Sequence, residues 1–234
     1  MSAAAQGRGE HITECRAVGV VPNANATPLA NALRGMCTKY NKMNVYEATL
    51  TIPGKNTNMR VQRRVRPSNN TNPVHEKLAD RWCVLWESAP NLGPTYRDLP
   101  ATVREVCESQ CAGSSAPAFW QSLGAKFQYN NKEAAARKLS LGAKFQYDMV
   151  KEGNEYICHH KGFEMRVQLM RILAPTVPGN PDSATKNVSA NFLLDVTTRV
   201  GEGQHVEGAR AVGSFGQSLQ PLVSLQRAER PIAG

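Results

Sequence analysis

The sequence predicts a mainly antiparallel α+β fold, in which a multi-stranded sheet closes into a β-barrel with a few flanking helices. Three observations support this fold class: apolar and polar residues alternate along much of the chain, tight turns join consecutive segments, and strands and helices do not alternate regularly. A large antiparallel sheet hides its edges best by closing on itself. We therefore expect a disordered tail at 1–10 and a single barrel domain over 11–234.

The composition sets broad limits on the class of protein. The 234 residues are 41% hydrophobic and 20% charged, which is enough apolar content for a sizeable core and excludes a wholly disordered chain. The sequence has no run of 18 apolar residues, so it predicts no membrane-spanning helix. Residues 1–10 lack the apolar stretch of a signal peptide. We therefore expect a cytosolic or nuclear protein. The net charge of +9 permits acidic partners or nucleic acid without demonstrating either.

The N-terminal half is expected to contain four strands and two helices. The order is strand 12–21, helix 28–36, strands 45–52, 59–66 and 80–86, and helix 100–111. Thr27 can cap the first helix, and Pro28 suits the first helical position that follows it. Pro100 is expected to start the second helix in the same way.

The C-terminal half shows the clearer pattern. Strands 144–151 and 155–160 are expected to form a hairpin around Gly153, and a second turn at Lys161-Gly162 leads into strand 163–173. In that strand Met165 and Val167 belong to an apolar face that alternates with charged residues, which is typical of a sheet with one buried face. The remaining elements are a strand beginning at 192, a helix over 205–219 and a short final strand at 222–226.

No residue pattern indicates an active site, a metal site or a cofactor site. The chain has no phosphate-binding glycine loop, no Gly-x-Ser-x-Gly elbow and no His-Glu-x-x-His motif. The six cysteines are scattered and form no Cys-x-x-Cys pair, which favours buried, reduced thiols over metal ligands. We therefore expect no catalytic residue, no metal and no cofactor.

One strand is unusually basic. In the strand 59–66, Arg60, Arg63, Arg64 and Arg66 could bind phosphate or an acidic protein surface, because guanidinium groups suit both. Arg60, Arg64 and Arg66 should share one face, and the alternative is that this face is merely solvated. No aromatic side chains are interleaved for base stacking, which disfavours single-stranded nucleic acid. We take the four arginines as candidate partner contacts.

Several segments resemble a known family in both order and spacing. They are GAKFQY at 142–147, HKGF at 160–163, MRIL at 170–173, PGNPDS at 178–183, FLLDV at 192–196 and QSLQPLV at 217–223. This pattern is similar to Mediator subunit 18. The resemblance is good over 142–227, fair over 12–37 and loose over 43–118.

The resemblance implies a nuclear, non-enzymatic subunit of the Mediator head module, a transcription coactivator that links regulators to RNA polymerase II. It implies a closed barrel that pairs with the similarly folded subunit 20 and contacts the C-terminal helix of subunit 8, besides other head-module subunits. It implies neither a membrane nor a specific nucleic-acid sequence as partner.

A metal-dependent phosphohydrolase is the alternative, because the family's barrel resembles that of the triphosphate-tunnel enzymes. Such enzymes need two carboxylates at alternate positions of a strand to hold a divalent metal, and inward basic side chains to hold the triphosphate. Here Glu14, Glu164 and Asp195 each stand alone in their strand, so no strand supplies a metal cage by itself. We therefore expect a non-enzyme.

An eight-residue segment occurs twice. SLGAKFQY at 122–129 recurs at 140–147, which indicates a duplication whose origin as an insertion, a splice variant or a gene-model artefact stays open. We expect the second copy to enter the sheet, with Phe145 and Tyr147 ordered, because it is continuous with the following hairpin. Residues 122–140 should then form a mobile surface excursion that contains a short helix.

Overall fold

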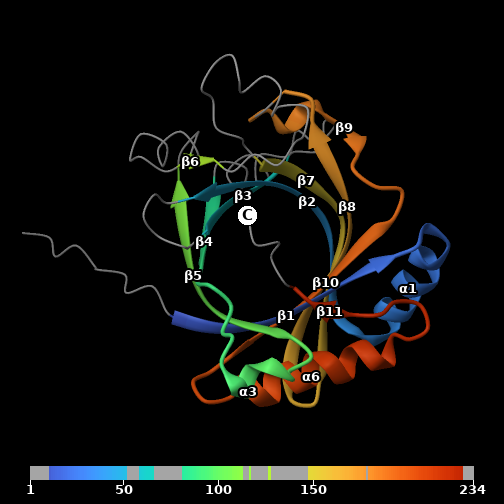
Figure 1. The fold of residues 1–234 in the computed structure, drawn as a ribbon. Helices are drawn as coiled ribbons and strands as arrows, with labels where there is room; N and C mark the ends of the chain where they lie inside the picture. Colours follow the sequence, from blue (N-terminus) through green and yellow to red (C-terminus); the bar gives the residue numbers. More distant parts are fainter. Residues whose placement is uncertain are drawn as a thin grey trace, which may run out of the picture.

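A closed antiparallel barrel forms the centre of the structure, a computed structural model that describes residues 11–51, 58–65, 81–112, 116, 126–127, 147–177 and 179–228. Eight strands of the described residues make the ring, and pairing between β8 and β10 closes it (Figure 1). In ring order they are β1 (His11–Val21), β5 (Thr102–Ala112), β4 (Arg81–Glu87), β3 (Asn58–Arg64), β2 (Cys37–Thr51), β7 (Tyr147–His160), β8 (Phe163–Pro175) and β10 (Phe192–Val200). The expected fold class is confirmed.

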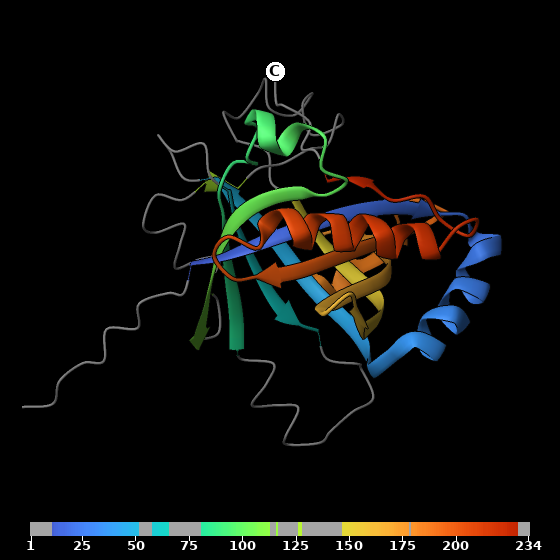
Figure 2. The same cartoon turned by 90° about the horizontal axis from the view of Figure 1, so that it is seen from below.

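Shorter elements flank the ring. They are the strands β6 (Lys126–Phe127), β9 (Ala184–Asn187) and β11 (Gln226–Arg227), the helices α1 (Asn23–Met36), α3 (Pro94–Arg97) and α6 (His205–Ser218), and a 3₁₀ turn at Pro181–Ser183. Helix α6 lies across the outside of β1 and β10, and α1 packs beside β7 (Figure 2). Glycines allow this close packing, because a Cβ on Gly208 would lie 2.6 Å from a methyl carbon of Val200. None of the helices in the described ranges is long and apolar enough to span a membrane.

The outward faces of the strands are apolar. On β8 the expected alternation is confirmed, since Met165 and Val167 are fully buried and Val167 lies opposite Val196 of β10. These side chains pack under α6, where Phe215 is also buried, and together they belong to a cluster that we call the outer layer. Its main members are Cys15, Ala17, Leu29, Leu33, Tyr156, Cys158, Met165, Val167, Leu169, Leu194, Val196, Val212 and Phe215.

A second apolar cluster lies on the outward faces of β2, β3, β4 and β7. It contains Tyr46, Ala48, Leu50, Met59, Val61, Trp82, Val84 and Val150. Tyr46 and Trp82 meet edge to face, with ring centroids 6.2 Å apart. Both walls of the barrel therefore carry a buried apolar cluster on the side that faces away from the barrel axis.

The helix expected at 100–111 is wrong, because this segment is the strand β5. It pairs on both sides, with Cys15 of β1 opposite Val103 and Val84 of β4 opposite Ser109. Its β-branched residues Thr102 and Val103 suit a sheet, and the two ladders outweigh the helix-start signal of Pro100.

The turn expected at Gly153 is also wrong, because β7 runs without interruption from Tyr147 to His160. A Cβ at Gly153 would lie 2.1 Å from the carbonyl oxygen of Leu169, so the glycine permits β8 to approach closely. The turn at Lys161-Gly162 is confirmed, with φ of 50° and 83°.

Other boundaries shift because tertiary contacts extend the elements. Helix α1 begins at Asn23 and not at 28, since the Asn25 side chain donates to the carbonyl of Leu222 and Ala26 is buried. Strand β2 follows directly at Cys37, and the final strand is Gln226–Arg227 instead of 222–226. The helix at 205–219 is confirmed as α6.

Both copies of the repeated segment contribute to the same edge of β2. Tyr147 of the second copy pairs with Thr49, and the next positions along β2 pair with Lys126 and Phe127 of the first copy. The expectation that residues 122–140 form a surface excursion is therefore wrong for Lys126 and Phe127, which pair with β2. The tail 1–10, Phe145 and most of 122–140 lie outside the described residues.

Candidate functional site

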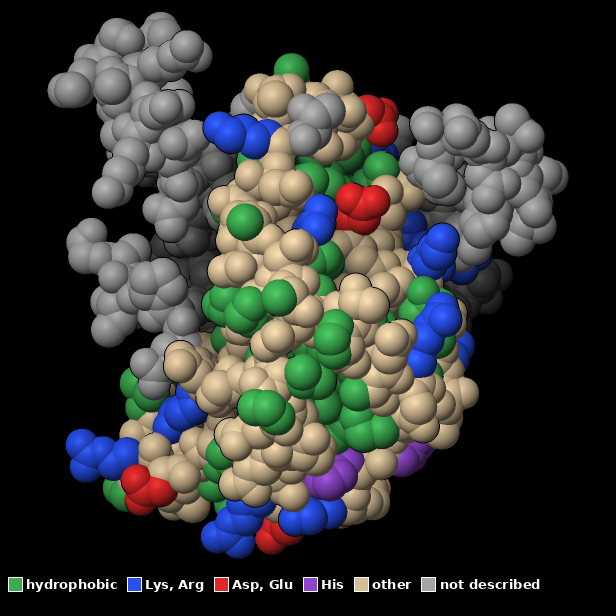
Figure 3. Space-filling view, turned by 90° about the vertical axis from the view of Figure 1, so that its right-hand side faces the viewer, with side chains coloured by type: hydrophobic (Ala, Val, Ile, Leu, Met, Phe, Trp, Pro, Cys, Tyr) green, Lys and Arg blue, Asp and Glu red, His purple; other side chains and the backbone are tan. Residues whose placement is uncertain are grey.

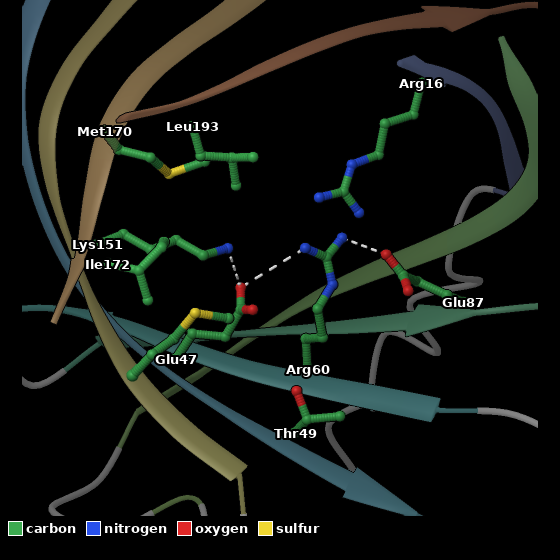
Figure 4. A pocket seen from close by; sticks show the side chains of 10 residues that line it. Arg16, Glu47, Thr49, Arg60, Glu87, Lys151, Met170, Ile172 and Leu193 are labelled. Atoms are coloured by element: carbon green, nitrogen blue, oxygen red, sulfur yellow. Dashed lines mark hydrogen bonds and ion pairs between the residues drawn. The ribbon is translucent and has the colours of Figure 1, made fainter. Parts of the chain in front are cut away.

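The interior of the barrel carries charged side chains from seven strands. They are Glu14 and Arg16 (β1), Glu47 (β2), Arg60 (β3), Glu87 (β4), Arg104 (β5), Lys151 (β7) and Asp195 (β10), a set that we call the interior network. Figure 4 shows five of them pointing toward one another from opposite walls. Each follows from strand alternation, because its neighbours along the chain face outward. Arg104 is only 1% exposed and is the largest fully buried side chain among the described residues.

Two glutamates organise the centre of this network. Glu47 accepts from Lys151 at 2.6 Å, lies 3.5 Å from Arg60 and also accepts from the Gln62 amide. Glu87 accepts from Arg60 through one carboxylate oxygen and from Arg104 through the other, at 3.0 Å. Each carboxylate therefore has two cationic partners, supplied by strands on both sides of it.

A third pair joins the first and the last strand of the ring. Arg16 contacts Asp195 through two parallel hydrogen bonds, of 2.9 Å from Nε and 2.5 Å from Nη2. This fork geometry fixes both side chains. Burial alone would lower the pKa of Arg16, but the charge of Asp195 raises it, so the guanidinium stays charged.

The electrostatics of Glu47 show that the ion pairs outweigh burial. Burial would raise the pKa of this carboxyl, but Lys151 and Arg60 lower it to about 2. Glu47 is therefore ionised in the folded protein at any ordinary pH. The network as a whole contains four cations and four carboxylates, so its formal charges cancel.

A cavity of about 270 Å³ opens beside the network. Its charged side consists of Arg16, Arg60, Lys151, Glu47 and Glu87, and its apolar side of Met149, Met170, Ile172 and Leu193. Figure 4 shows Met170 and Leu193 on the wall opposite Glu87. Three polar atoms of the network are buried without a hydrogen-bond partner in the described part of the chain: Oε1 of Glu14, Nε of Arg60 and Nε of Arg104.

Further ion pairs continue the charged lining toward solvent. Arg199 of β10 contacts Glu108 of β5, and the Cys83 thiol donates to the other oxygen of Glu108 at 3.2 Å. Arg166 of β8 lies 3.7 Å from Glu155 of β7, with the Arg166 side chain 47% exposed. The charged side chains of the barrel interior therefore range from fully buried, at Glu87, to about half exposed, at Arg166.

The structure divides the four arginines that the sequence singled out. Arg60 lies in the interior network, and Arg63 lies on the outward face, with its guanidinium 4.9 Å from the ring of Trp82. Arg64 is exposed at the end of β3, and Arg66 lies outside the described residues. A role in partner contact stays a prediction, and the buried, ion-paired position of Arg60 makes it the least suited of the three described arginines.

The interior network is not visible in the sequence of any single strand, because no strand supplies two of its carboxylates. Glu47 and Glu87 come from different strands and meet only when the barrel closes. The available signal was a charged residue between apolar neighbours, such as Glu47 between Tyr46 and Ala48. That pattern is usual for a solvated face, and only closure of the sheet turns it inward.

In Figure 3, the Lys and Arg side chains of the described residues lie mostly toward the edges of the visible face, and apolar side chains lie near its centre. Within the described ranges, no three His, Cys, Asp or Glu side chains come together as a metal cluster.

The fold and the interior define a class: a closed antiparallel barrel whose interior is lined by ion pairs and whose outer face is partly covered by helices. No family model matches the chain, and no curated protein matches it in sequence. Among solved structures, a chain of the Schizosaccharomyces pombe Mediator head module superimposes with a TM-score of 0.64 at 15% identity, covering 92% of this chain and 98% of that chain. This similarity shows a shared fold.

More distant structures also match. The Mimivirus capping enzyme triphosphatase gives a TM-score of 0.47 at 10% identity, covering 88% of this chain and 89% of that chain. The PH1012 protein from Pyrococcus horikoshii gives 0.43 at 13% identity, covering 90% of this chain and 94% of that chain. TM-scores below 0.5 support no inference about this chain.

Proposed function

We propose that this chain is a non-enzymatic subunit of a Mediator head module, corresponding to subunit 18, and that it acts in the nucleus as a coactivator between regulators and RNA polymerase II. The observation that carries the proposal is the shared fold over almost the full length of both chains, 92% of this one and 98% of the Mediator chain. The segments that resemble subunit 18 in sequence support the same assignment.

The chemistry of the interior agrees with a structural role. Glu47 and Glu87 each have two cationic partners, and Arg16 is held by Asp195. A divalent metal would have to displace these cations from the carboxylates, and a triphosphate would have to displace the carboxylates from the arginines. Both exchanges remove good ion pairs from a buried site, which costs several kcal/mol per ion left unpaired, roughly 3–5.

Partners of the proposed complex are the subunit 20 homologue, as a second barrel, the C-terminal helix of subunit 8, and other head-module subunits. Co-expression with the first two should give one complex on size-exclusion chromatography and raise the melting temperature by several degrees. Binding to the folded state stabilises it by about 3 kcal/mol at a hundredfold excess of partner over the dissociation constant. A chain that stays monomeric and equally stable with both partners would contradict the proposal.

The second candidate is a triphosphate-tunnel-type metal-dependent phosphohydrolase. The observation in its favour is the cavity beside Arg16, Arg60 and Lys151, together with the unpaired Oε1 of Glu14. The test is phosphate release from tripolyphosphate with magnesium or manganese. We expect none above the blank.

Matched variants make this assay decisive. Turnover that is lost in Arg60→Gln and kept in the exposed control Arg64→Gln would establish the hydrolase and overturn the non-enzymatic assignment. Equal phosphate release from both variants would indicate a contaminant.

A further inference from the structure

Cys37 of β2 and Cys158 of β7 lie directly opposite each other across an antiparallel ladder. Cys158 is buried in the outer layer, and Cys37 packs against that layer from the same side of the sheet. No other cysteine has a cysteine opposite it in the described ladders: Cys15 faces Thr198 and Val103, Cys83 faces Gln110 and Gln62, Cys107 faces Trp86 and His11, and Cys111 faces Trp82.

This register meets the geometric requirement for a disulfide. Directly opposite residues of an antiparallel pair have Cα atoms about 4.5–5.5 Å apart and side chains on the same face. Disulfides span Cα separations of about 4.4–6.8 Å. The register therefore places the two Cα atoms within the range of separations that a disulfide spans.

Local contacts hold Cys37 in this place. Its backbone N–H donates to the carbonyl of Leu33, which ends helix α1, and its thiol points to the carbonyl of Arg34 at 3.5 Å. The ladder is irregular at the next residue, Thr38, whose hydroxyl donates to the carbonyl of Ile157 at 3.1 Å. The irregularity is thus anchored to β7 beside Cys158.

The two thiols differ in their access to solvent. Cys37 is partly exposed, whereas Cys158 is 1% exposed. Burial raises the pKa of the Cys158 thiol to about 11, and the neighbouring Cys37 adds to this shift. Cys37 is therefore the thiol that an external reagent reaches first, and Cys158 is the one that resolves the product.

We propose that Cys37 and Cys158 form a redox-active dithiol, which a low-molecular-weight disulfide such as oxidised glutathione converts into a cross-strand disulfide. The Cys37 thiolate attacks one sulfur of the glutathione disulfide, forms a mixed disulfide and releases one glutathione thiolate, which takes up a proton. The deprotonated Cys158 sulfur then attacks the Cys37 sulfur and releases the second glutathione. The protein dithiol loses two electrons and two protons, and glutathione disulfide gains both as two thiols.

The bond would connect the junction of α1 and β2 to the strand β7. It would close a long loop of the chain, which restricts the unfolded state more than the folded one. The oxidised protein should therefore melt at a higher temperature than the reduced protein. This property does not depend on the proposed membership of a Mediator head module.

The experiment uses the full chain, reduced, desalted and incubated with oxidised glutathione at pH 8.5. After alkylation of the free thiols, non-reducing peptide mapping by mass spectrometry should identify one cross-link, between Cys37 and Cys158. The melting temperature should rise by several degrees and return when dithiothreitol is added. In Cys158→Ser or Cys158→Ala, Cys37 should instead accumulate a stable glutathione adduct.

The matched control is Cys111→Ser, which should keep both the cross-link and the melting shift. The proposal is overturned if the wild-type chain shows no linked peptide while Cys37 carries glutathione, or if Cys37→Ser keeps the whole melting shift. Because Cys37 is partly exposed, Cys37→Ser should fold even if both substitutions at the buried Cys158 prevent folding.

Discussion

The two faces of the barrel wall are built on opposite principles. Outward side chains such as Val167 and Val196 are apolar and are stabilised by burial under α6, at about 1.5–3 kcal/mol for each fully buried side chain. Inward side chains such as Glu87 and Arg104 are charged, and their mutual attraction is offset by the loss of hydration. The comparison indicates that the outer layer stabilises the fold, whereas the interior network is stable only while every partner is present.

The largest expected effect tests the interior network by removing one of its centres. Glu87→Ala leaves Arg60 and Arg104 without their shared carboxylate in a buried site, so it should lower the free energy of unfolding by about 3–5 kcal/mol. Urea denaturation measures this loss. The control Glu202→Ala removes an exposed carboxylate and should change stability by less than about 0.5 kcal/mol. A loss below 1 kcal/mol at Glu87 would mean that water replaces the missing partner.

The second expected effect is a dependence of stability on pH, which the interior network should show and the outer layer should not. The pKa of Glu47 is lowered to about 2 in the folded protein, below its ordinary value of 4.5, so its stabilising contribution is complete above pH 4.5 and is lost as the pH falls toward 2. At about 1.4 kcal/mol for each pKa unit, the loss is at most about 3 kcal/mol. Urea denaturation from pH 5 to pH 2 measures it.

Two variants sharpen this result. Glu47→Gln should be less stable at pH 5 but should show a shallower decline with falling pH. Leu194→Ala, in the outer layer, should lower the free energy of unfolding by about 2–5 kcal/mol, and this loss should be the same at every pH. A decline in Glu47→Gln as steep as that of the wild type would assign the acid sensitivity to other carboxylates.

The smallest expected effect concerns the exposed end of β3. Arg64→Glu should change stability by less than about 0.5 kcal/mol, because the side chain is exposed. If the strand contacts an acidic partner surface, the same change should slow association at low salt, since peripheral charges act mainly on the association rate. Biolayer interferometry at two salt concentrations measures this rate. The matched control is Arg210→Glu, which changes an exposed arginine on α6. Equal association rates for the two variants would indicate that Arg64 is solvated and does not contact the partner.

Local patterns predicted the elements in which one face alone is buried. The alternation in β8 and the helical pattern of α6 are correct because each depends on neighbours in the sequence. The helix expected at 100–111 failed because β5 takes its structure from two ladders with β1 and β4, which no local pattern contains. Gly153 suggested a turn, but a glycine is required there because the backbone of the distant Leu169 leaves no room for a Cβ atom.

The interior network was beyond prediction for the same physical reason. Arg16 and Asp195 are 179 positions apart in the sequence, and Glu47 and Lys151 are 104 apart. Each residue alone is compatible with a solvated strand face. Their pairing depends on which strands become neighbours and on closure of the ring, so the sequence alone drew attention to Arg60, Glu14 and Asp195 and not to their partners.

The closure of the ring through β10 also constrains how a cell makes this protein. A ribosome completes β1 early, but β10, its partner along one whole edge, follows some 179 positions later. At translation rates of roughly 5–20 residues per second, that edge waits about ten to forty seconds with its backbone donors and acceptors unpaired. During this time the nascent chain presents an open strand edge to its surroundings. Binding factors that cover nascent strands should therefore act on this chain before β10 has left the ribosome.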